Sequence, residues 1–282
     1  MVENHASGHA ILQDSERLSL DDRFAFRCDA DRPCFTSCCQ DVAIVLTPYD
    51  VLRLKHALRI DSSEFLERHT LLPIAKDQRV PVVLLKMDPE TKRCPFVGEQ
   101  GCKVYGARPW ACRMYPLGLA EPRTPTPKDR AFHFLVRDDN CLGHACDRSL
   151  TVRDWRAEQG VDDYDMHGTS FKALMLHEFW DRQEPLSPQK LEMYYTACYD
   201  LDRFRRFVFE TTLLGTFEVD ADRAEAMRLD DEEMLEFAMQ WLLFCLCGDQ
   251  TMRLKRSVVE QRTLAAARRG AVSGEAKRDG LR

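Results

Sequence analysis

The sequence lacks any long apolar run. Its longest mostly apolar stretch, AMQWLLFCLC at residues 238–247, is far shorter than the roughly 20 residues that a membrane-spanning helix requires. The first residues, MVENHASGHAILQDSERL, are polar and of mixed charge, without the basic segment and apolar centre of a secretory signal peptide. We therefore expect no membrane insertion and a cytoplasmic location.

Glycine-rich phosphate-binding loops are also missing. The 13 glycines are scattered, and neither G-x-G-x-x-G nor G-x-x-x-x-G-K-[ST] occurs. A doubly wound methyltransferase needs such a loop after a strand, and none is present. Binding of S-adenosylmethionine is possible, but no visible motif supports it. His177-Glu178 lacks the second histidine of H-E-x-x-H, which argues against a zinc hydrolase of that kind. Whether the protein is an enzyme stays open.

Positive charge is concentrated at one end of the chain. The net charge is −6, yet residues 253–282 hold nine Lys or Arg against three acidic residues, which leaves the rest strongly acidic. An acidic body without interleaved basic and aromatic residues argues against a nucleic-acid partner. We interpret residues 253–282 as a basic tail.

What the chain has in abundance is cysteine. Four of the 12 cysteines lie in FRCDADRPCFTSCCQD at residues 26–41, and five more lie between Cys94 and Cys146. In a reducing compartment a disulfide framework is not expected, and clustered thiols more often bind metal. Four thiolates can enclose a tetrahedral zinc ion or an iron–sulfur cluster.

The spacing of these cysteines matches neither of two common motifs. Paired C-x-x-C knuckles are absent, and Asp41 occupies the position at which a C-x3-C-x2-C radical-enzyme motif would need its third cysteine. Nine thiols exceed one four-ligand site, so the sequence allows either two sites or one site with additional packing cysteines. The candidate metal ligands are Cys28, Cys34, Cys38, Cys39, Cys94, Cys102, Cys112, Cys141 and Cys146.

The remaining three cysteines have another character. Cys245 and Cys247 are two residues apart in an apolar helical stretch, so they face different sides of the helix. Cys198 is alone in a second helical stretch. We predict that all three pack in the protein interior.

The pattern of elements predicts an α+β fold. Residues 42–46, 80–88 and 131–138 are strand-like, whereas Thr47, Pro48 and Asp50 begin a helix and residues 61–70 form another. From TVRD at residue 151 onward, residues 165–183, 187–214 and 230–248 show helical periodicity. We expect a cysteine-rich metal-binding domain of short strands and helices at 24–150, an all-helical domain at 151–252 and the basic tail.

One stretch carries a family resemblance. The early cysteines, Cys94 and GCKVYGARPWACRMYP at residues 101–116 together resemble the YkgJ-type cysteine-cluster family, the zinc- or iron-chelating CxxCxxCC domain, over about residues 26–146. The most specific part combines Cys102, Tyr105, Arg108, Pro109, Cys112, Arg113, Tyr115 and Pro116. The chain departs from the family in spacing, because C-x5-C-x3-CC replaces the tight CxxCxxCC.

The resemblance implies a metal and little about activity. The family is similar to the cysteine-bearing part of flagellin lysine methylases, which carry an iron–sulfur cluster. We therefore predict a protein that chelates iron, as an iron–sulfur cluster, or zinc; the alternative is an iron–sulfur-dependent protein-lysine methyltransferase. The helical half is expected to cover the site or dock a protein partner.

Two arginines and a histidine near the cysteines can each be interpreted in two ways. Arg108 and Arg113 flank Cys112, where they could offset thiolate charge or simply stack on aromatic rings. His144 lies between two candidate ligands, and a solvated loop histidine is favoured over a ligand. His133, between two phenylalanines, is expected to be structural.

Overall fold

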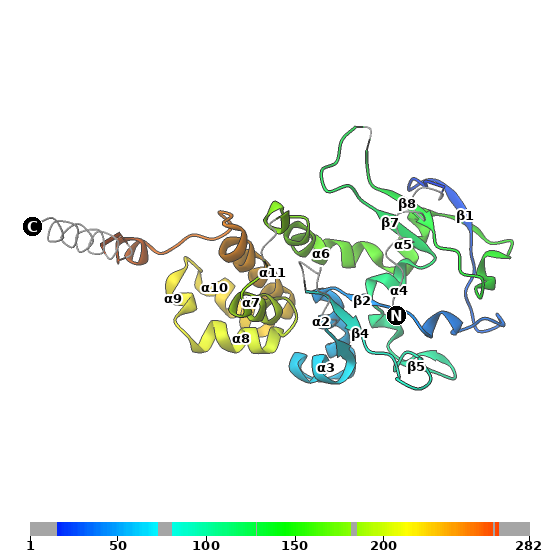
Figure 1. The fold of residues 1–282 in the computed structure, drawn as a ribbon, viewed down its shortest axis with the longest axis horizontal. Coiled ribbons are helices and arrows are strands. Elements are labelled where there is room, and N and C mark those ends of the chain that lie inside the picture. Colours follow the sequence, from blue (N-terminus) through cyan, green and yellow to red (C-terminus); the bar gives the residue numbers. More distant parts are fainter. Residues whose placement is uncertain (1–15, 73–80, 128, 182–184, 262, 265–282) are drawn as a thin grey trace, which may run out of the picture. The chain divides into compact units, whose positions relative to one another are not determined.

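The structure is a computed structural model that describes residues 16–72, 81–127, 129–181, 185–261 and 263–264 (Figure 1). The chain divides into two compact units, Met1–Leu191 and Glu192–Arg282. Most of the predicted basic tail, from residue 265 onward, lies outside the described residues.

All strands of the described residues lie in the first unit and are two to four residues long. They form small antiparallel sheets of order β1-β9, β2-β4-β3, β5-β6 and β7-β8. The strands are β1 Arg23–Ala25, β2 Val45–Leu46, β3 Thr70–Leu71, β4 Val83–Leu85, β5 Val97–Gly98, β6 Gly101–Cys102, β7 Leu117–Ala120, β8 Phe132–Leu135 and β9 Ser149–Thr151.

The three strands predicted from sequence are present but shorter. β2, β4 and β8 occupy only part of the predicted stretches 42–46, 80–88 and 131–138. A strand extends only as far as a partner continues its hydrogen-bond ladder. β2 and β4 share just two residue pairs, Val45 with Leu84 and Leu46 with Val83.

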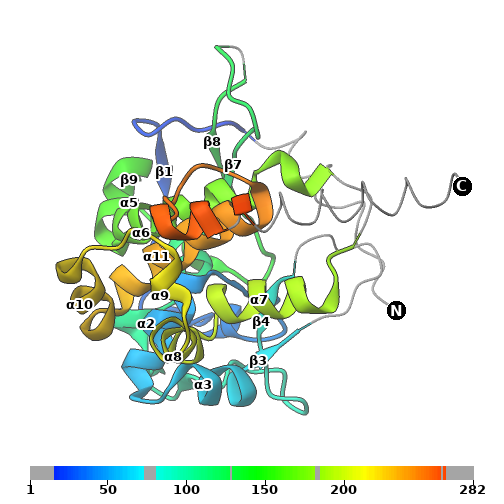
Figure 2. The same cartoon turned by 90° about the vertical axis from the view of Figure 1, so that its left-hand side faces the viewer.

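Helices of the first unit surround these sheets. They are α2 Pro48–Leu58, α3 Ser62–His69, α4 Trp110–Met114, α5 Val152–Gln159 and α6 Val161–Met175, with 3-10 turns η1 Ser37–Cys39, η2 Tyr105–Ala107, η3 Leu142–His144 and η4 Glu178–Asp181. Figure 2 shows α2 and α3 together with β3 and β4. The helix predicted at 165–183 thus begins earlier, at Val161, and ends at Met175.

Helix starts follow the local capping signals. The Thr47 hydroxyl accepts the Asp50 N–H while Asp50 accepts the Thr47 N–H, which is the capping box expected for α2. Thr151 and Asp154 form the same arrangement at α5. Asp61 caps α3 through the Glu64 N–H. Each of these helix starts is determined by hydrogen bonds within four residues, so it can be predicted from the sequence.

The apolar core of the first unit joins segments that lie far apart in its sequence. Phe24 pairs with Leu150 across the β1–β9 ladder, and Trp155 packs edge-on against Phe24 and Phe26. Val161 at the start of α6 belongs to the same buried cluster. A division is predicted at residue 150, whereas the compact unit extends to Leu191 and includes α5 and α6, whose side chains share this core.

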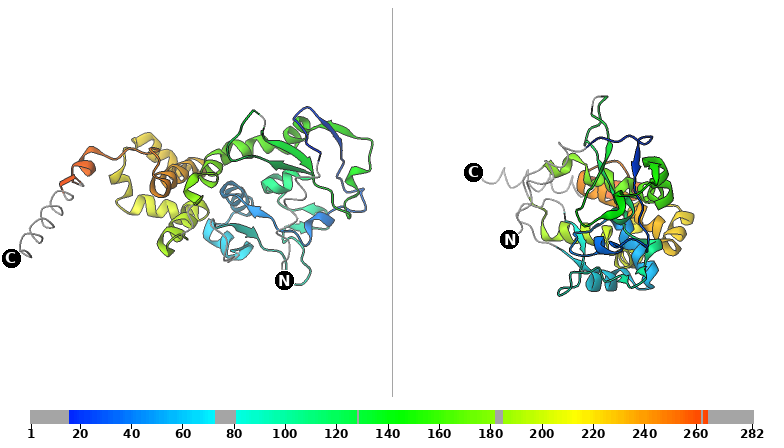
Figure 3. Two further views of the ribbon diagram at one scale, coloured as in Figure 1. Left: turned by 45° about the horizontal axis from the view of Figure 1, so that its top comes forward. Right: turned by 90° about the vertical axis from the view of Figure 1, so that its right-hand side faces the viewer.

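The second unit is helical and forms the yellow to orange part of the ribbon in Figure 3. Its elements are α7 Pro188–Cys198, which begins just before the unit, α8 Leu201–Glu210, α9 Leu213–Thr216, α10 Ala221–Leu229, α11 Asp231–Leu242 and the π-helical turn η5 Leu243–Cys247. Phe204, Phe237, Met227, Met234 and Leu242 are at most 1% exposed. Asp230 caps α11 and Gly248 ends the last turn in a left-handed conformation.

The single helix predicted over residues 187–214 is wrong. The chain leaves the helix at Tyr199 and Asp200 and again at Thr211 and Thr212. The buried positions at 194, 197, 198, 201, 204 and 208 continue at helical spacing through the first break, so apolar periodicity could not reveal it. α10 was also missed by the sequence analysis.

The α+β class is confirmed, with strands in the N-terminal part and helices dominating the C-terminal part. Among the described residues, no helix has the length and apolar character needed to cross a membrane.

Candidate metal centre

The adjacent thiols Cys38 and Cys39 lie on the short turn η1. Thr36 and Asp41, which bracket this turn, have φ angles of 66° and 53°. Left-handed backbone is unfavourable for residues other than glycine, and such residues cluster at functional sites. The backbone therefore bends sharply on both sides of the cysteine pair.

A hairpin brings a second cysteine segment to this turn. The Cys94 N–H donates to the Cys39 carbonyl at 2.8 Å. Cys102 pairs with Val97 in the β5–β6 ladder. The hairpin, labelled by its strand β5 in Figure 1, turns through Gly101 at φ 107°, where an added Cβ would lie 3.0 Å from the Phe35 ring. Residues far apart in sequence are thus joined by backbone contacts, and their thiols become neighbours.

Helix α4 carries Cys112 and has no side-chain cap of its own. Its first N–H group, that of Trp110, donates instead to Oδ1 of Asp50 at 2.7 Å. Asp50 is fully buried, and its Oδ2 accepts the Thr47 N–H at 2.7 Å. One carboxylate therefore caps both α2 and α4. Burial raises the pKa of Asp50 to about 6, against the opposing effect of the hydrogen bonds from Thr47 and Trp110.

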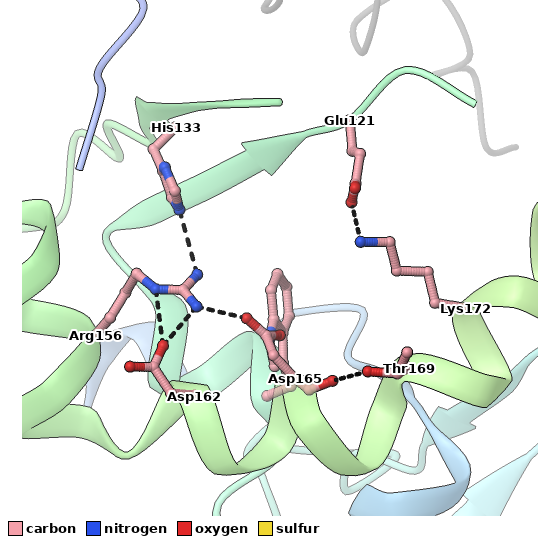
Figure 4. A network of polar contacts seen from close by, with 8 residues as sticks. Glu121, His133, Arg156, Asp162, Asp165, Thr169 and Lys172 are labelled. Atoms are coloured by element: carbon pink, nitrogen blue, oxygen red, sulfur yellow. Dashed lines mark hydrogen bonds and ion pairs between the residues drawn. The ribbon is translucent and has the colours of Figure 1, made fainter. Parts of the chain in front are cut away.

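A polar network holds α4 from its other side (Figure 4). The Trp110 indole N–H donates to Asp165 on α6 at 2.7 Å. Arg156 donates to the other oxygen of Asp165 at 2.7 Å and to Asp162 at 2.6 Å. His133 on β8 lies 3.4 Å from Arg156; burial, then the charge of Arg156, lowers its pKa. His133 is structural, as predicted.

The two arginines flanking Cys112 have different roles. Arg113 is buried and donates to the carbonyls of Arg108, Gln159 and Gly106 at 2.9, 2.6 and 2.6 Å. Its guanidinium also stacks over the Tyr164 ring at 4.4 Å. Arg113 therefore ties backbone segments together.

Arg108 combines the two roles that the sequence left open. It stacks over the Tyr105 ring at 3.8 Å. The interaction with Cys39 is the main cause that lowers the pKa of Cys38, and the charge of Arg108 acts weakly in the same direction. It also opposes the upward shift in the pKa of Cys112. Arg108 thus offsets thiolate charge while it rests on an aromatic ring.

Four thiols form one neighbourhood, here called the outer set: Cys28, Cys34, Cys38 and Cys141. Burial, then the charges of Cys38, Cys34 and Cys141, raises the pKa of Cys28. Two hydrogen bonds join the segments that carry Cys28, Cys34 and Cys141. The Leu142 N–H donates to Cys34 Sγ at 3.3 Å, and the Arg27 N–H donates to the Gly143 carbonyl at 3.0 Å.

Four other thiols form a second neighbourhood, here called the inner set: Cys39, Cys94, Cys102 and Cys112. Burial raises the pKa of Cys112 to about 12, and the charges of Cys94, Asp50 and Cys102 act in the same direction. Burial, then the charge of Cys102, raises the pKa of Cys94.

Cys38 and Cys39 connect the two sets. The Cys39 S–H donates a hydrogen bond to Cys38, which lowers the pKa of Cys38 to about 7. The same bond, then burial, raises the pKa of Cys39, on which Cys94 and Cys112 also act. Adjacent residues thus belong to different sets.

The ninth predicted ligand, Cys146, stands apart from both sets. Its S–H donates to the Arg148 carbonyl at 3.6 Å, and its charge acts on Arg27. His144, from the same loop, is half-buried and packs edge-on against Phe26 at 5.2 Å between ring centroids. The favoured picture of a solvated His144 is therefore wrong.

The three cysteines of the second unit differ in burial. Cys198 is buried as predicted, and burial raises its pKa. Cys247 is half-buried, whereas Cys245 is exposed, which corrects the prediction that it packs in the interior. Helix η5 turns Cys245 outward because its buried residues are Leu243 and Leu246.

The donor set fits a thiophilic metal in kind. Both sets consist of thiols, and the buried Tyr115 hydroxyl has no nitrogen or oxygen hydrogen-bond partner where it faces Cys141. Within the described residues, however, no three His, Cys, Asp or Glu side chains already stand close enough to hold one ion. The thiols are neighbours, and a metal would have to draw them into a coordination sphere.

Several supporting residues were missed by the sequence analysis. Asp50 was recognised only as a residue of the α2 start, although it also caps α4. No local sequence pattern marks Asp165 or Arg156, because their roles depend on packing between α4, α5 and α6. The only local hint was the unusually dense run of aromatic and basic residues around Cys112.

Comparisons with known proteins agree with this site. Residues 27–142 match the family CxxCxxCC, described as "Putative zinc- or iron-chelating domain". Searches of curated proteins and of solved structures gave no match. The matched segment 27–142 holds eight of the nine candidate ligands and is similar to this family over less than half of the chain.

Proposed function

We propose that the first unit chelates iron, as an iron–sulfur cluster, or zinc through the cysteine thiolates of residues 28–141. The single observation that carries the proposal is the convergence of thiols from three separate segments. The loop at 26–41, the segment running from Cys94 through the β5–β6 hairpin to α4, and the loop around Cys141 each supply ligands. Few reasons other than metal binding place so many thiols together.

We also propose that the protein functions in a reducing compartment. The first unit holds nine cysteines, which we propose to serve as thiols and not as a disulfide framework. Free thiols at this density suit a reducing compartment such as the cytoplasm.

Iron is placed before zinc because of the number of thiols. A set of four thiolates serves either a tetrahedral zinc ion or a cubane iron–sulfur cluster, but the described site supplies thiols in excess. The first experiment is metal analysis with a visible spectrum on anaerobically purified protein. Iron with a broad band near roughly 400 nm identifies a cluster, and stoichiometric zinc in colourless protein identifies a zinc centre.

Variants test the ligand set. Cys112→Ser and Cys38→Ser should each lower the metal content, because serine is a far poorer ligand for soft metals. Cys245→Ser is the matched control, since Cys245 is an exposed thiol of the second unit. Equal loss of metal in all three variants, or no loss in the first two, would refute the assignment.

Methyl transfer and partner docking stay predictions from the sequence. Isothermal titration with S-adenosylmethionine addresses the first: binding at micromolar affinity would support the methyltransferase alternative. A protein partner of the helical unit would be sought only after the metal is identified.

A further inference from the structure

We infer that His133 is a pH-sensitive switch: its neutral imidazole holds Arg156 against α6, and its protonation releases that contact. The inference goes beyond metal chelation and does not depend on it. In the network of Figure 4, β8, α5 and α6 each contribute side chains that face one another. Nε2 of His133 lies 3.4 Å from Arg156, and Arg156 donates in turn to Asp165.

The contact between His133 and Arg156 requires a neutral imidazole. A guanidinium group has N–H donors and no acceptor, so Nε2 of His133 must accept the hydrogen bond. The ring therefore carries its single proton on Nδ1. Protonation would place an N–H group and a second positive charge against the guanidinium, which turns attraction into repulsion. His133 is only 7% exposed, so little water is present to screen this repulsion.

Two of the segments packed against His133 bring no charge to its imidazole. Its partner on β7 is Leu119, and its backbone pairs with that of Leu18. Arg17, beside Leu18, is charged, but its guanidinium lies over the Phe132 ring, 4.2 Å from the ring centroid. Successive residues of a strand point to opposite faces, so Arg17 lies on the other face of β8 from the imidazole.

The charges that face His133 within the described residues come from α5 and α6. Arg156 on α5 is the nearer, and Asp165 on α6 lies beyond it. Burial, then the charge of Arg156, lowers the pKa of His133, and the opposing effect of Asp165 is the smallest of the three. The folded state thus binds this proton less tightly than the unfolded state, so the stability that the neutral ring contributes is present above about pH 6.5 and lost as the pH falls.

Arg156 connects His133 to Trp110 through one carboxylate. It donates to Oδ2 of Asp165 at 2.7 Å, and Oδ1 of Asp165 accepts the indole N–H of Trp110, also at 2.7 Å. Arg156 has a second acceptor in Asp162, whose side chain is 69% exposed. Repulsion from a charged His133 would drive the guanidinium toward Asp162 and solvent. Asp165 would then lose the cation that orients it, and its bond to the indole would weaken.

The test follows the indole N–H of Trp110 by NMR in the full-length protein. Tryptophan is labelled with ¹⁵N, and the signal is identified by its loss in Trp110→Phe. As the pH falls we expect this signal to shift as one proton binds, with a midpoint below 6.5, the ordinary pKa of histidine. In His133→Gln the shift should be at least about threefold smaller, because the glutamine carbonyl can accept from Arg156 but gains no charge.

His56→Gln is the matched control, since His56 is an exposed histidine of α2, and it should titrate as the wild type does. Asp50, with a pKa of about 6, accepts the backbone N–H of Trp110 and is the competing source of a shift. A shift that persists in His133→Gln and disappears in Asp50→Asn would overturn the inference.

A second measurement needs no variant that might fail to fold. The Cε1–H signal of His133 in the wild type should titrate with the same midpoint as the indole signal of Trp110. Different midpoints, or an indole signal that stays unchanged while His133 titrates, would overturn the switch.

Discussion

The two units are stabilised in different ways. The second unit has helices of up to 12 residues around side chains such as Phe204, Phe237 and Met234, all at most 1% exposed. The cysteine-bearing part of the first unit has strands of two residues and several irregular loops. An apolar core stabilises the second unit by itself, whereas the cysteine region depends on polar contacts and, by our proposal, on metal.

Metal removal should therefore affect only the first unit. At a free metal concentration of about 1,000 times Kd, binding to one site stabilises the folded state by about 4 kcal/mol. We expect chelation to lower the unfolding transition of the first unit strongly and to leave that of the second unit in place. Differential scanning calorimetry with and without a chelator measures both. A single transition that shifts as a whole would show that the units do not unfold separately.

Phe204→Ala should instead destabilise the second unit and leave the first unit unchanged. Phe204 is 1% exposed, and its ring centroid lies 5.3 Å from Trp241. Truncating a buried phenylalanine costs about 3–5 kcal/mol because a cavity remains. The transition of the second unit should fall, with metal content unchanged. Phe207→Ala on the same helix is the control: Phe207 is 40% exposed and should cost far less. A loss of metal in Phe204→Ala would contradict the comparison.

Asp50→Asn tests the buried carboxylate that caps two helices. An asparagine offers one oxygen, so either the Thr47 or the Trp110 N–H would face the amide NH₂, at a cost of about 1–3 kcal/mol. The variant should also bind metal at the inner set more weakly, because α4 carries Cys112. Asp61→Asn is the control, since it caps α3 alone and asparagine caps helices equally well.

The same variant has an expected pH dependence. Burial raises the pKa of Asp50 to about 6 from its usual 3.8, so the folded state binds this proton more tightly than the unfolded state. The contribution to stability is fully present below about pH 4 and is lost as the pH rises through 6. The stability difference between wild type and Asp50→Asn should therefore narrow from pH 4 to pH 7. Urea unfolding at several pH values checks this; a widening gap would contradict it.

The smallest effect concerns reactivity without any change in stability. In metal-free protein the hydrogen bond from Cys39 lowers the pKa of Cys38 to about 7, whereas burial raises that of Cys28. Iodoacetamide attacks the thiolate, so the alkylation rate of Cys38 should reach half its maximum near pH 7. The rate for Cys28, which is also exposed, should still rise above pH 8. Mass spectrometry of peptides resolves the two, and coincident pH profiles would rule out the proposed hydrogen bond.

The sequence predicted the features that depend on a few neighbouring residues. The starts of α2 and α5 follow from Thr47 and Thr151, because a cap acts within one turn. The family and its cysteines were also recognisable, since spacing is a property of the sequence. Strand lengths and the break at Asp200 were not, because they depend on pairing and packing partners elsewhere in the chain.

The sorting of the thiols could not be predicted either. Neighbours in sequence, Cys38 and Cys39, belong to different sets, and Cys39 meets Cys94 only through a contact between distant segments. Likewise, Asp50 reaches Trp110 across the fold. Sequence spacing indicates which residue types can bind a metal, but the tertiary fold decides which of them meet.

The contact between the Cys94 N–H and the Cys39 carbonyl has a consequence for the order of folding. Bringing two chain positions together costs entropy that grows with the length of chain between them. Once Cys39 is held at Cys94, its neighbour Cys38 is already placed, so the outer set no longer needs to search for one of its members. The inner set should therefore assemble first during folding, and the outer set should close last.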